Sequence, residues 1–103
     1  MKVTGAIDKE TRCSHYYENN DIIAIKFYCC KEYFPCYQCH AEYGCGHNKV
    51  WPKVKFDEKA ILCGNCKNEL TINEYLNGGY SCPNCYASFN PGCSIHYHLY
   101  FQK

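Results

Sequence analysis

The sequence predicts a small, irregular domain stabilised by bound metal, with short β-strands, one short helix and a zinc-ribbon-like C-terminal lobe. Two observations predict this fold class. The 103 residues are 47% hydrophobic, but 11 cysteines and 11 tyrosines supply much of that figure, so an aliphatic core would be thin. Small chains of this kind are usually stabilised by disulfides or metals. Six of the cysteines form Cys-x-x-Cys pairs, which is the second observation.

Zinc explains these cysteines better than disulfides do. An odd number of thiols leaves one unpaired in a fully oxidised monomer. Residues 1–8 contain no apolar run, so we expect no secretory signal and a reducing, cytoplasmic location, where structural disulfides are rare. Structural zinc takes four cysteine or histidine ligands in a tetrahedron, and closely spaced pairs supply them. We therefore interpret the cysteines as zinc ligands.

The N-terminal half contains one clear strand. Residues 1–12 are polar and read as a flexible arm, and the single domain follows over 13–103, with lobes at 13–50 and 60–103. Residues 21–28 are rich in β-branched and aromatic side chains, which predicts a strand buried on both faces. The strand runs into Cys29 and Cys30. These cysteines serve different metals if the strand continues, because neighbouring side chains alternate, but the same metal if a turn intervenes.

The C-terminal lobe has the strongest pattern. Its four cysteines follow the spacing C-x2-C-x15-C-x2-C, which is typical of a zinc ribbon. Between the two pairs, Thr71 and Glu74 resemble a capping box and Asn77-Gly78 a helix stop, so a helix over 71–77 is predicted. A hairpin turning at Asn77-Gly78 is the alternative. The alternation over 95–101 predicts a last strand.

The central segment carries more donors than one zinc can use. Cys36-x-x-Cys39 follows a proline and predicts a metal-binding turn, and the adjacent His40 would most easily point to a second metal. His47 could join His40 there, or it could be an ordinary exposed loop histidine. Earlier in the chain, Cys13-x-His15 offers a further pair. The centre of the chain is therefore predicted to serve two zinc ions.

The order of these motifs resembles the CHY-type zinc finger, and the match spans residues 13 to about 90. The resemblance implies three zinc ions (Zn²⁺) and divides the first two sites, whose ligands interleave. It also favours the stand-alone members of the family, since the chain has no room for the RING domain found in its ubiquitin ligases. The implied ligand sets are Cys13, His15, Cys36 and Cys39; Cys29, Cys30, His40 and His47; and Cys63, Cys66, Cys82 and Cys85.

Four further donors lie outside these twelve, namely Cys45, Cys93, His96 and His98. His96 and His98 would share a face of the last predicted strand. A fourth zinc site is the weaker interpretation, because Cys45 would have to fold back across the whole second lobe to reach the tail. Leftover donors are more often ordinary core or surface residues.

Charge and composition exclude several functions. Eleven basic residues balance ten acidic ones and form no dense run, whereas proteins that bind nucleic acid usually carry a basic stripe or patch. We therefore expect no nucleic-acid partner. No apolar run is long enough to span a membrane.

We expect no enzyme, because four-ligand zinc sites leave no open position. The first hypothesis is a structural zinc module that binds an unidentified protein. The alternative is a zinc-handling or thiol-redox helper whose cysteines exchange zinc or disulfides.

Overall fold

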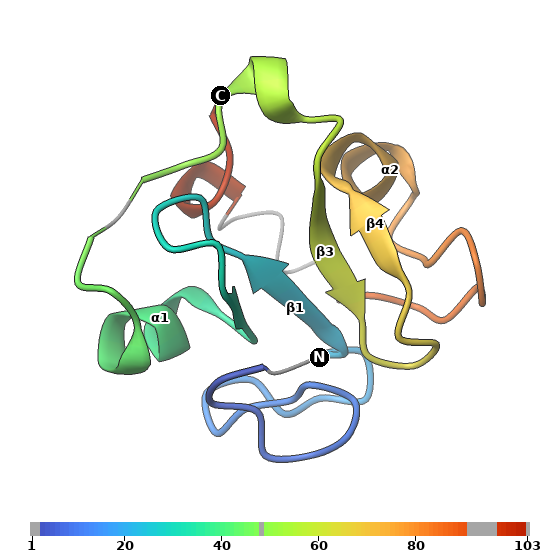
Figure 1. Cartoon of the computed structure of the whole chain (residues 1–103). Helices are drawn as coiled ribbons and strands as arrows, with labels where there is room; N and C mark the ends of the chain where they lie inside the picture. Colours follow the sequence, from blue (N-terminus) through green and yellow to red (C-terminus); the bar gives the residue numbers. More distant parts are fainter. Residues whose placement is uncertain (1–2, 48, 91–96, 103) are drawn as a thin grey trace.

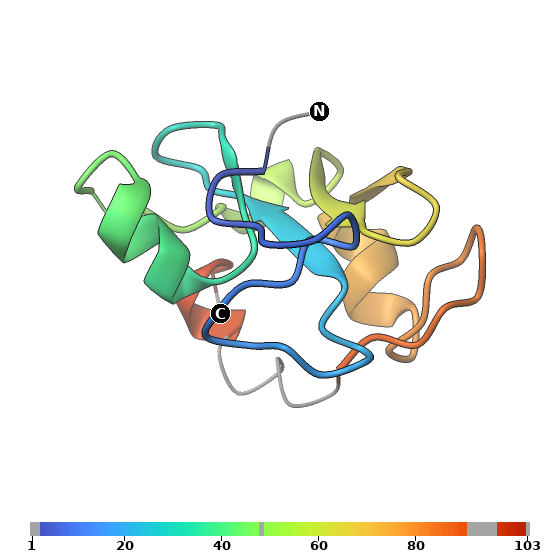
Figure 2. The ribbon, with the colours of Figure 1, turned by 90° about the horizontal axis from the view of Figure 1, so that it is seen from below.

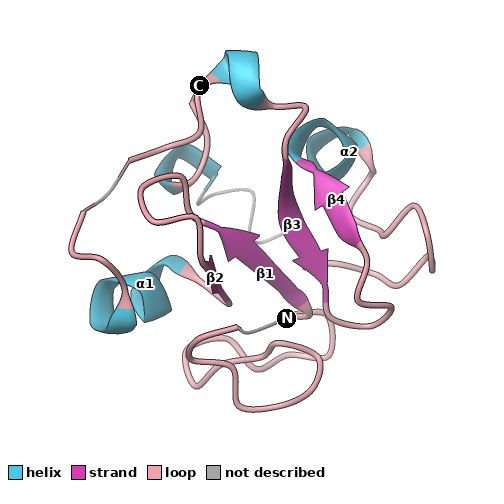
Figure 3. Cartoon of the chain, viewed as in Figure 1, coloured by secondary structure: helices cyan, strands magenta, loops and turns pink. Residues whose placement is uncertain are grey.

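A four-stranded antiparallel sheet lies at the centre of the protein (Figure 1). The computed structural model describes residues 3–47, 49–90 and 97–102. The sheet has the strand order β2-β1-β3-β4, and its strands are short, with loops making up most of the remaining chain (Figure 3). The strands are β1 (Ile23–Lys26), β2 (Tyr33–Phe34), β3 (Lys59–Cys63) and β4 (Glu69–Thr71).

Strand β1 confirms the strand predicted over 21–28, although it is shorter. Ile23, Ala24 and Ile25 are all buried, as expected for a strand covered on both faces. Ile25 lies opposite Phe34 of β2 on one side and Ile61 of β3 on the other. Because β1 pairs with strands from both halves of the chain, the two predicted lobes share one sheet and one core.

A turn follows β1 and decides where the paired cysteines lie. Residues 28–30 form this turn, and Lys31 adopts a left-handed conformation with φ 59° and donates its backbone N–H to Phe27 O at 2.7 Å. Cys29 and Cys30 therefore leave the strand before their side chains could alternate between faces. Of the two alternatives, the structure shows the one in which both cysteines reach the same site.

Two short helices flank the sheet. Helix α2 (Ile72–Asn77) confirms the predicted helix, and the hairpin alternative is wrong. Both bonds of its capping box are present: Glu74 N–H donates to Thr71 Oγ1 at 3.0 Å and Thr71 N–H to Glu74 Oε1 at 2.8 Å. Helix α1 (Tyr37–Tyr43) was not predicted. Its N-cap is Cys36, whose sulfur accepts the Cys39 N–H. A 3-10 turn, η1 (Lys53–Lys55), precedes β3. None of the described helices has the length and apolar character needed to cross a membrane.

The predicted last strand is wrong over its described part. Residues 97–99 form a helical turn, and Phe101 N–H donates to Tyr97 O at 2.8 Å. Tyr97 and Phe101 both contact Tyr75 of α2, with ring centroids 5.5 and 6.4 Å apart. Side chains four residues apart share a helical face, so this spacing fits a turn that packs on α2. Residues 95 and 96 lie outside the described residues.

The described part of the N-terminal arm, residues 3–12, is folded against the domain. Val3 bridges to Tyr33 of β2, and Arg12 forms ion pairs with Asp8 and Glu10 at 3.0 and 2.9 Å. Figures 1 and 2 show this dark blue segment running beneath the start of β1. Trp51 is buried, and its indole N–H donates to Lys26 O at 2.7 Å.

Candidate metal centre

Cysteine and histidine side chains gather into three groups of four, and within each group the ligand atoms all lie within 4.8 Å of one another. Three of the twelve residues come from helix α1 or its N-cap, and most of the others come from turns and loops. We refer to the groups as site 1 (Cys13, His15, Cys36 and Cys39), site 2 (Cys29, Cys30, His40 and Cys45) and site 3 (Cys63, Cys66, Cys82 and Cys85).

The spacing of the donors fits tetrahedral zinc. Bonds of about 2.3 Å to sulfur and about 2.0 Å to nitrogen require sulfurs roughly 3.8 Å apart and sulfur–nitrogen pairs roughly 3.5 Å apart. The Cys63–Cys85 and Cys66–Cys82 sulfurs are both 3.7 Å apart. In site 1, the Cys36 sulfur lies 3.6 Å from Cys13 and 3.5 Å from His15 Nδ1. These separations are too long for disulfide bonds, which are about 2.05 Å.

Site 1 joins the segment that follows the N-terminal arm to helix α1. His15 turns Nδ1 toward the site, 3.5 Å from the sulfurs of both Cys36 and Cys39. Its other nitrogen, Nε2, lies 2.6 Å from Glu42 Oε1, one turn along α1 from Cys39. A carboxylate at this position accepts the Nε2 proton, which leaves the Nδ1 lone pair free for a metal. Glu42 therefore positions a ligand, a role that the sequence analysis did not predict.

Site 2 lies between the turn after β1 and the end of helix α1. His40 Nε2 is 3.3 Å from the sulfur of Cys29 and 3.6 Å from that of Cys45. The His40 ring stacks on Phe27, with centroids 4.1 Å apart and planes only 4° from parallel, which fixes its direction. Cys39 and His40 are adjacent in α1 and so point about 100° apart around its axis, toward sites 1 and 2 respectively.

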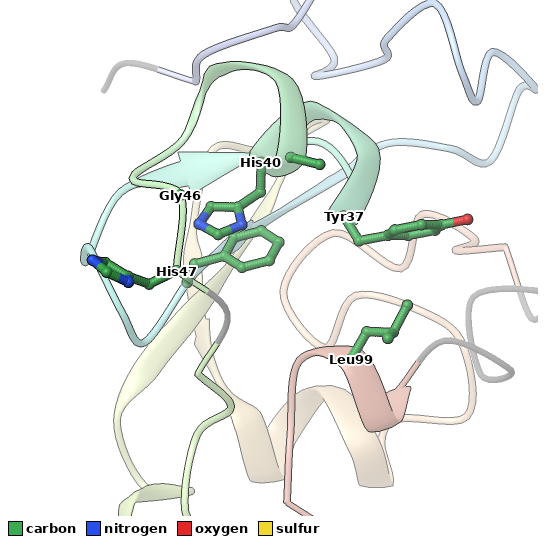
Figure 4. A pocket seen from close by; sticks show the side chains of 7 residues that line it. Tyr37, His40, Gly46, His47 and Leu99 are labelled. Carbon is green, nitrogen blue, oxygen red and sulfur yellow. The ribbon is translucent and has the colours of Figure 1, made fainter.

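The ligand set of site 2 differs from the one implied by the family resemblance. Cys45 occupies the position expected for His47, whose side chain is exposed and outside the group. The cause is the loop after α1: Gly44 ends the helix in an extended conformation, which brings Cys45 back toward His40. Gly46 then adopts φ 82° and directs His47 away (Figure 4). The glycine on each side of Cys45 is the sequence signal that could have indicated a tight, metal-binding loop.

Site 3 has the geometry of two matching metal-binding turns. Each turn ends with a residue in the left-handed region, Lys67 with φ 64° and Tyr86 with φ 64°. Each of these residues donates its N–H at 2.9 Å to the carbonyl of the first cysteine of its pair, Cys63 or Cys82. The backbone N–H groups of Asn84 and Cys85 point at the Cys82 sulfur at 3.4 and 3.5 Å, which stabilises a thiolate.

Burial opposes thiolate formation at several of the donors. Desolvation raises the pKa of Cys63 to about 12 and the pKa values of Cys30 and Cys39 to about 11. Cys85 is the opposite case, because the Asn65 side-chain amide lowers its pKa to about 6. Desolvation also lowers the pKa of His40, which keeps this imidazole neutral and able to bind a metal. A metal that binds these groups must therefore displace protons from the buried thiols.

A comparison with protein families agrees with this geometry. The family described as CHY zinc finger matches residues 13–91. The chain belongs to the CHY zinc finger family. Two similar proteins are named Helper of Tim protein 13. The one from Saccharomyces cerevisiae is 43% identical, and the match covers 94% of this chain and 86% of that protein. The one from Kluyveromyces lactis is 40% identical, and the match covers 94% of this chain and 84% of that protein. A relative from Schizosaccharomyces pombe is 38% identical over 93% of this chain. No solved structure matches.

The family and the donor groups together identify a zinc-binding module with three zinc sites. The remaining donors do not form a fourth group among the described residues. Cys45 belongs to site 2, and His98 is exposed on the turn at 97–99. Cys93 and His96, the other two donors considered for a fourth site, lie outside the described residues.

Proposed function

We propose that this CHY zinc finger is a non-enzymatic module whose three zinc ions hold its fold, and that the folded surface binds another protein. The observation that carries the proposal is the completeness of sites 1 and 3, in each of which four protein side chains stand at tetrahedral spacing. Sites with four protein ligands are structural rather than catalytic, because no position remains for a substrate.

The names of the relatives support a particular class of partner. Helper of Tim protein 13 describes a helper of Tim proteins, and the likeness to the two relatives of that name extends over 94% of this chain. We propose that this chain likewise assists a Tim protein. Large exposed side chains available for such contact include Tyr43, Val54 and Tyr86, of which Val54 and Tyr86 are 86% and 80% exposed.

We further propose that the protein works in a reducing compartment, the cytoplasm in particular. None of the ten cysteines in the described part of the chain forms a disulfide bond, and all ten belong to the three donor groups. Cell fractionation of the tagged protein tests this location, and enrichment in any oxidising compartment would contradict it.

Zinc handling is the second candidate function, and one observation favours it. In site 2 only His40 is buried, whereas Cys45 is exposed, so this group is more accessible than the other two. A zinc held at such a site is open to attack by ligands of another protein.

The experiment that tests the first proposal measures binding of a purified Tim protein to the chain by calorimetry. The zinc-loaded chain should bind, and the chain stripped by a chelator should not, because metal-binding energy and folding energy are coupled. The Tyr86→Ser variant tests the surface, with Tyr75→Phe, a substitution inside the core, as a comparison. Absence of binding by the zinc-loaded chain would refute the proposal that a Tim protein is the partner. Native mass spectrometry after mild peroxide then separates the functions: three zinc ions retained favour the structural module, and zinc loss favours zinc handling.

A further inference from the structure

We propose that Cys45 and His47 are alternative fourth ligands of site 2, and that exchange between them makes this zinc the one that the protein can pass to an acceptor. The inference rests on zinc binding at site 2 and gives the zinc-handling candidate a specific site. It goes beyond the family resemblance, which implies His47 alone.

The first observation is the contrast in burial among the sites. Site 1 contains three buried ligands and site 3 contains two, and their remaining ligands are half-buried. In site 2, His40 is buried, Cys29 and Cys30 are half-buried, and Cys45 is exposed. An incoming ligand can therefore approach site 2 at the Cys45 position without first opening the core.

The second observation is that a fifth donor residue, His47, lies beside the four of site 2. The main chain of His47 already touches the site, since its carbonyl oxygen lies 3.4 Å from the Cys29 sulfur and 3.8 Å from the Cys45 sulfur. The His47 imidazole itself is not part of the group. In Figure 4 this ring points away from His40.

The third observation is a pivot between the two competing donors. Gly46 separates Cys45 from His47, adopts φ 82°, and has open space where a side chain would be. On the helix side, Gly44 is fixed by its N–H bond to His40 O at 2.8 Å. Rotation at Gly46 can therefore redirect His47 without moving α1. A cavity of about 290 Å³ lined by His40, Gly46 and His47 gives the ring room to turn.

The exchange is a ligand substitution without a change in oxidation state. With Cys45 bound, three thiolates and one imidazole give the zinc centre a net charge of −1. If a nitrogen of the His47 imidazole were to bind the zinc in place of Cys45, the bond to the Cys45 sulfur would break, the released thiolate would take up a proton from the solvent, and the centre would become neutral. A thiolate from an acceptor protein can enter by the same substitution, because Cys45, at the fourth position, is exposed.

The test compares Cys45→Ser, His47→Ala and the double variant by zinc counting and cobalt substitution, with His98→Ala as a control at an exposed histidine outside the sites. Both single variants should retain three metal ions, and the double variant should retain two. In the cobalt-loaded protein, Cys45→Ser should lose about one tenth of the thiolate charge-transfer absorption, because the three sites contain ten thiolates. His47→Ala and His98→Ala should leave this absorption unchanged.

Kinetics test the transfer step. Zinc transfer from the wild-type protein to a coloured chelator should show one fast zinc, released at least about tenfold faster than the other two, and the double variant should lack this phase. Unchanged cobalt absorption in Cys45→Ser would show that His47 is the resident ligand and overturn the proposal. Loss of a metal ion from either single variant would rule out exchange, as would a fast phase that persists in the double variant. A wild-type protein with fewer than three zinc ions would instead refute the underlying zinc assignment.

Discussion

Replacing Glu42 with glutamine should weaken zinc binding at site 1 and leave sites 2 and 3 unchanged. Glu42 Oε1 lies 2.6 Å from His15 Nε2, and the opposite nitrogen of the same ring faces the sulfurs of Cys36 and Cys39. The glutamine oxygen can still accept the Nε2 proton, so the tautomer is kept. What is lost is the negative charge that makes the imidazole a more basic ligand.

The expected loss of zinc affinity depends on how exposed the Glu42 and His15 side chains are. Removal of a group that supports a ligand in this way typically costs 10-fold to 100-fold in metal affinity, or about 1.4 to 2.7 kcal/mol. The Glu42 side chain is 48% exposed and that of His15 17% exposed, so water screens much of the charge. We therefore expect the lower limit, a loss of about tenfold, for Glu42→Gln. Glu42→Ala also removes the acceptor and should cost more.

The assay is a competition titration against a chelator of known zinc affinity, followed by native mass spectrometry to count the ions that remain. Glu58→Gln is the matched control, because Glu58 is an exposed carboxylate outside all three sites. One zinc of three should shift in Glu42→Gln, and none in the control. Equal weakening of all three sites would show a general effect on the fold, and no shift at all would show that Glu42 does not position His15.

Substitutions at three other positions and the pH dependence test the rest of the structure. Cys82→Ser should lower the zinc count from three to two. The variant should also lose the cooperative thermal unfolding transition of the wild-type protein, because Cys63, the last residue of β3, is a ligand of the same site. Ile61→Ala removes a side chain that is 0% exposed and should cost about 2 to 5 kcal/mol in chemical denaturation of the zinc-loaded protein. Thr71→Ala breaks the capping box and should cost about 1 kcal/mol in the same assay, whereas Thr71→Ser should restore most of it. Acid should release zinc: burial raises the pKa of Cys63 to about 12, so protons compete increasingly with zinc as pH falls, and a zinc-sensitive dye should show release on titration from pH 8 toward about pH 4. Zinc release that increased with pH would contradict this sign.

The features that the sequence predicted correctly depend on interactions between residues that are close in the chain. Strand β1 follows from a run of β-branched residues, and helix α2 from the pairing of Thr71 with Glu74, because both signals act between neighbours in the chain. Site 3 follows from spacing, since two Cys-x-x-Cys pairs at this separation suit one tetrahedron.

Other features depended on contacts between distant segments. Helix α1 is short and begins at a cysteine sulfur, so its cap looked like an ordinary metal-binding turn. The turn at 97–99 exists because Tyr97 and Phe101 pack on Tyr75, which no local pattern reveals. The choice of Cys45 over His47 depends on backbone angles at Gly44 and Gly46, and glycine permits many such angles.

The interleaving of sites 1 and 2 also affects how the chain acquires its metal during synthesis. Cys13, His15, Cys29 and Cys30 leave the ribosome before Cys36 does, and together they already offer four suitable zinc donors. These four donors belong to two different native sites. A zinc ion captured early is therefore held by a mixed set, and it must be redistributed when helix α1 emerges. Site 3 needs no such redistribution, because no ligand of another site lies between Cys63 and Cys85 in the chain.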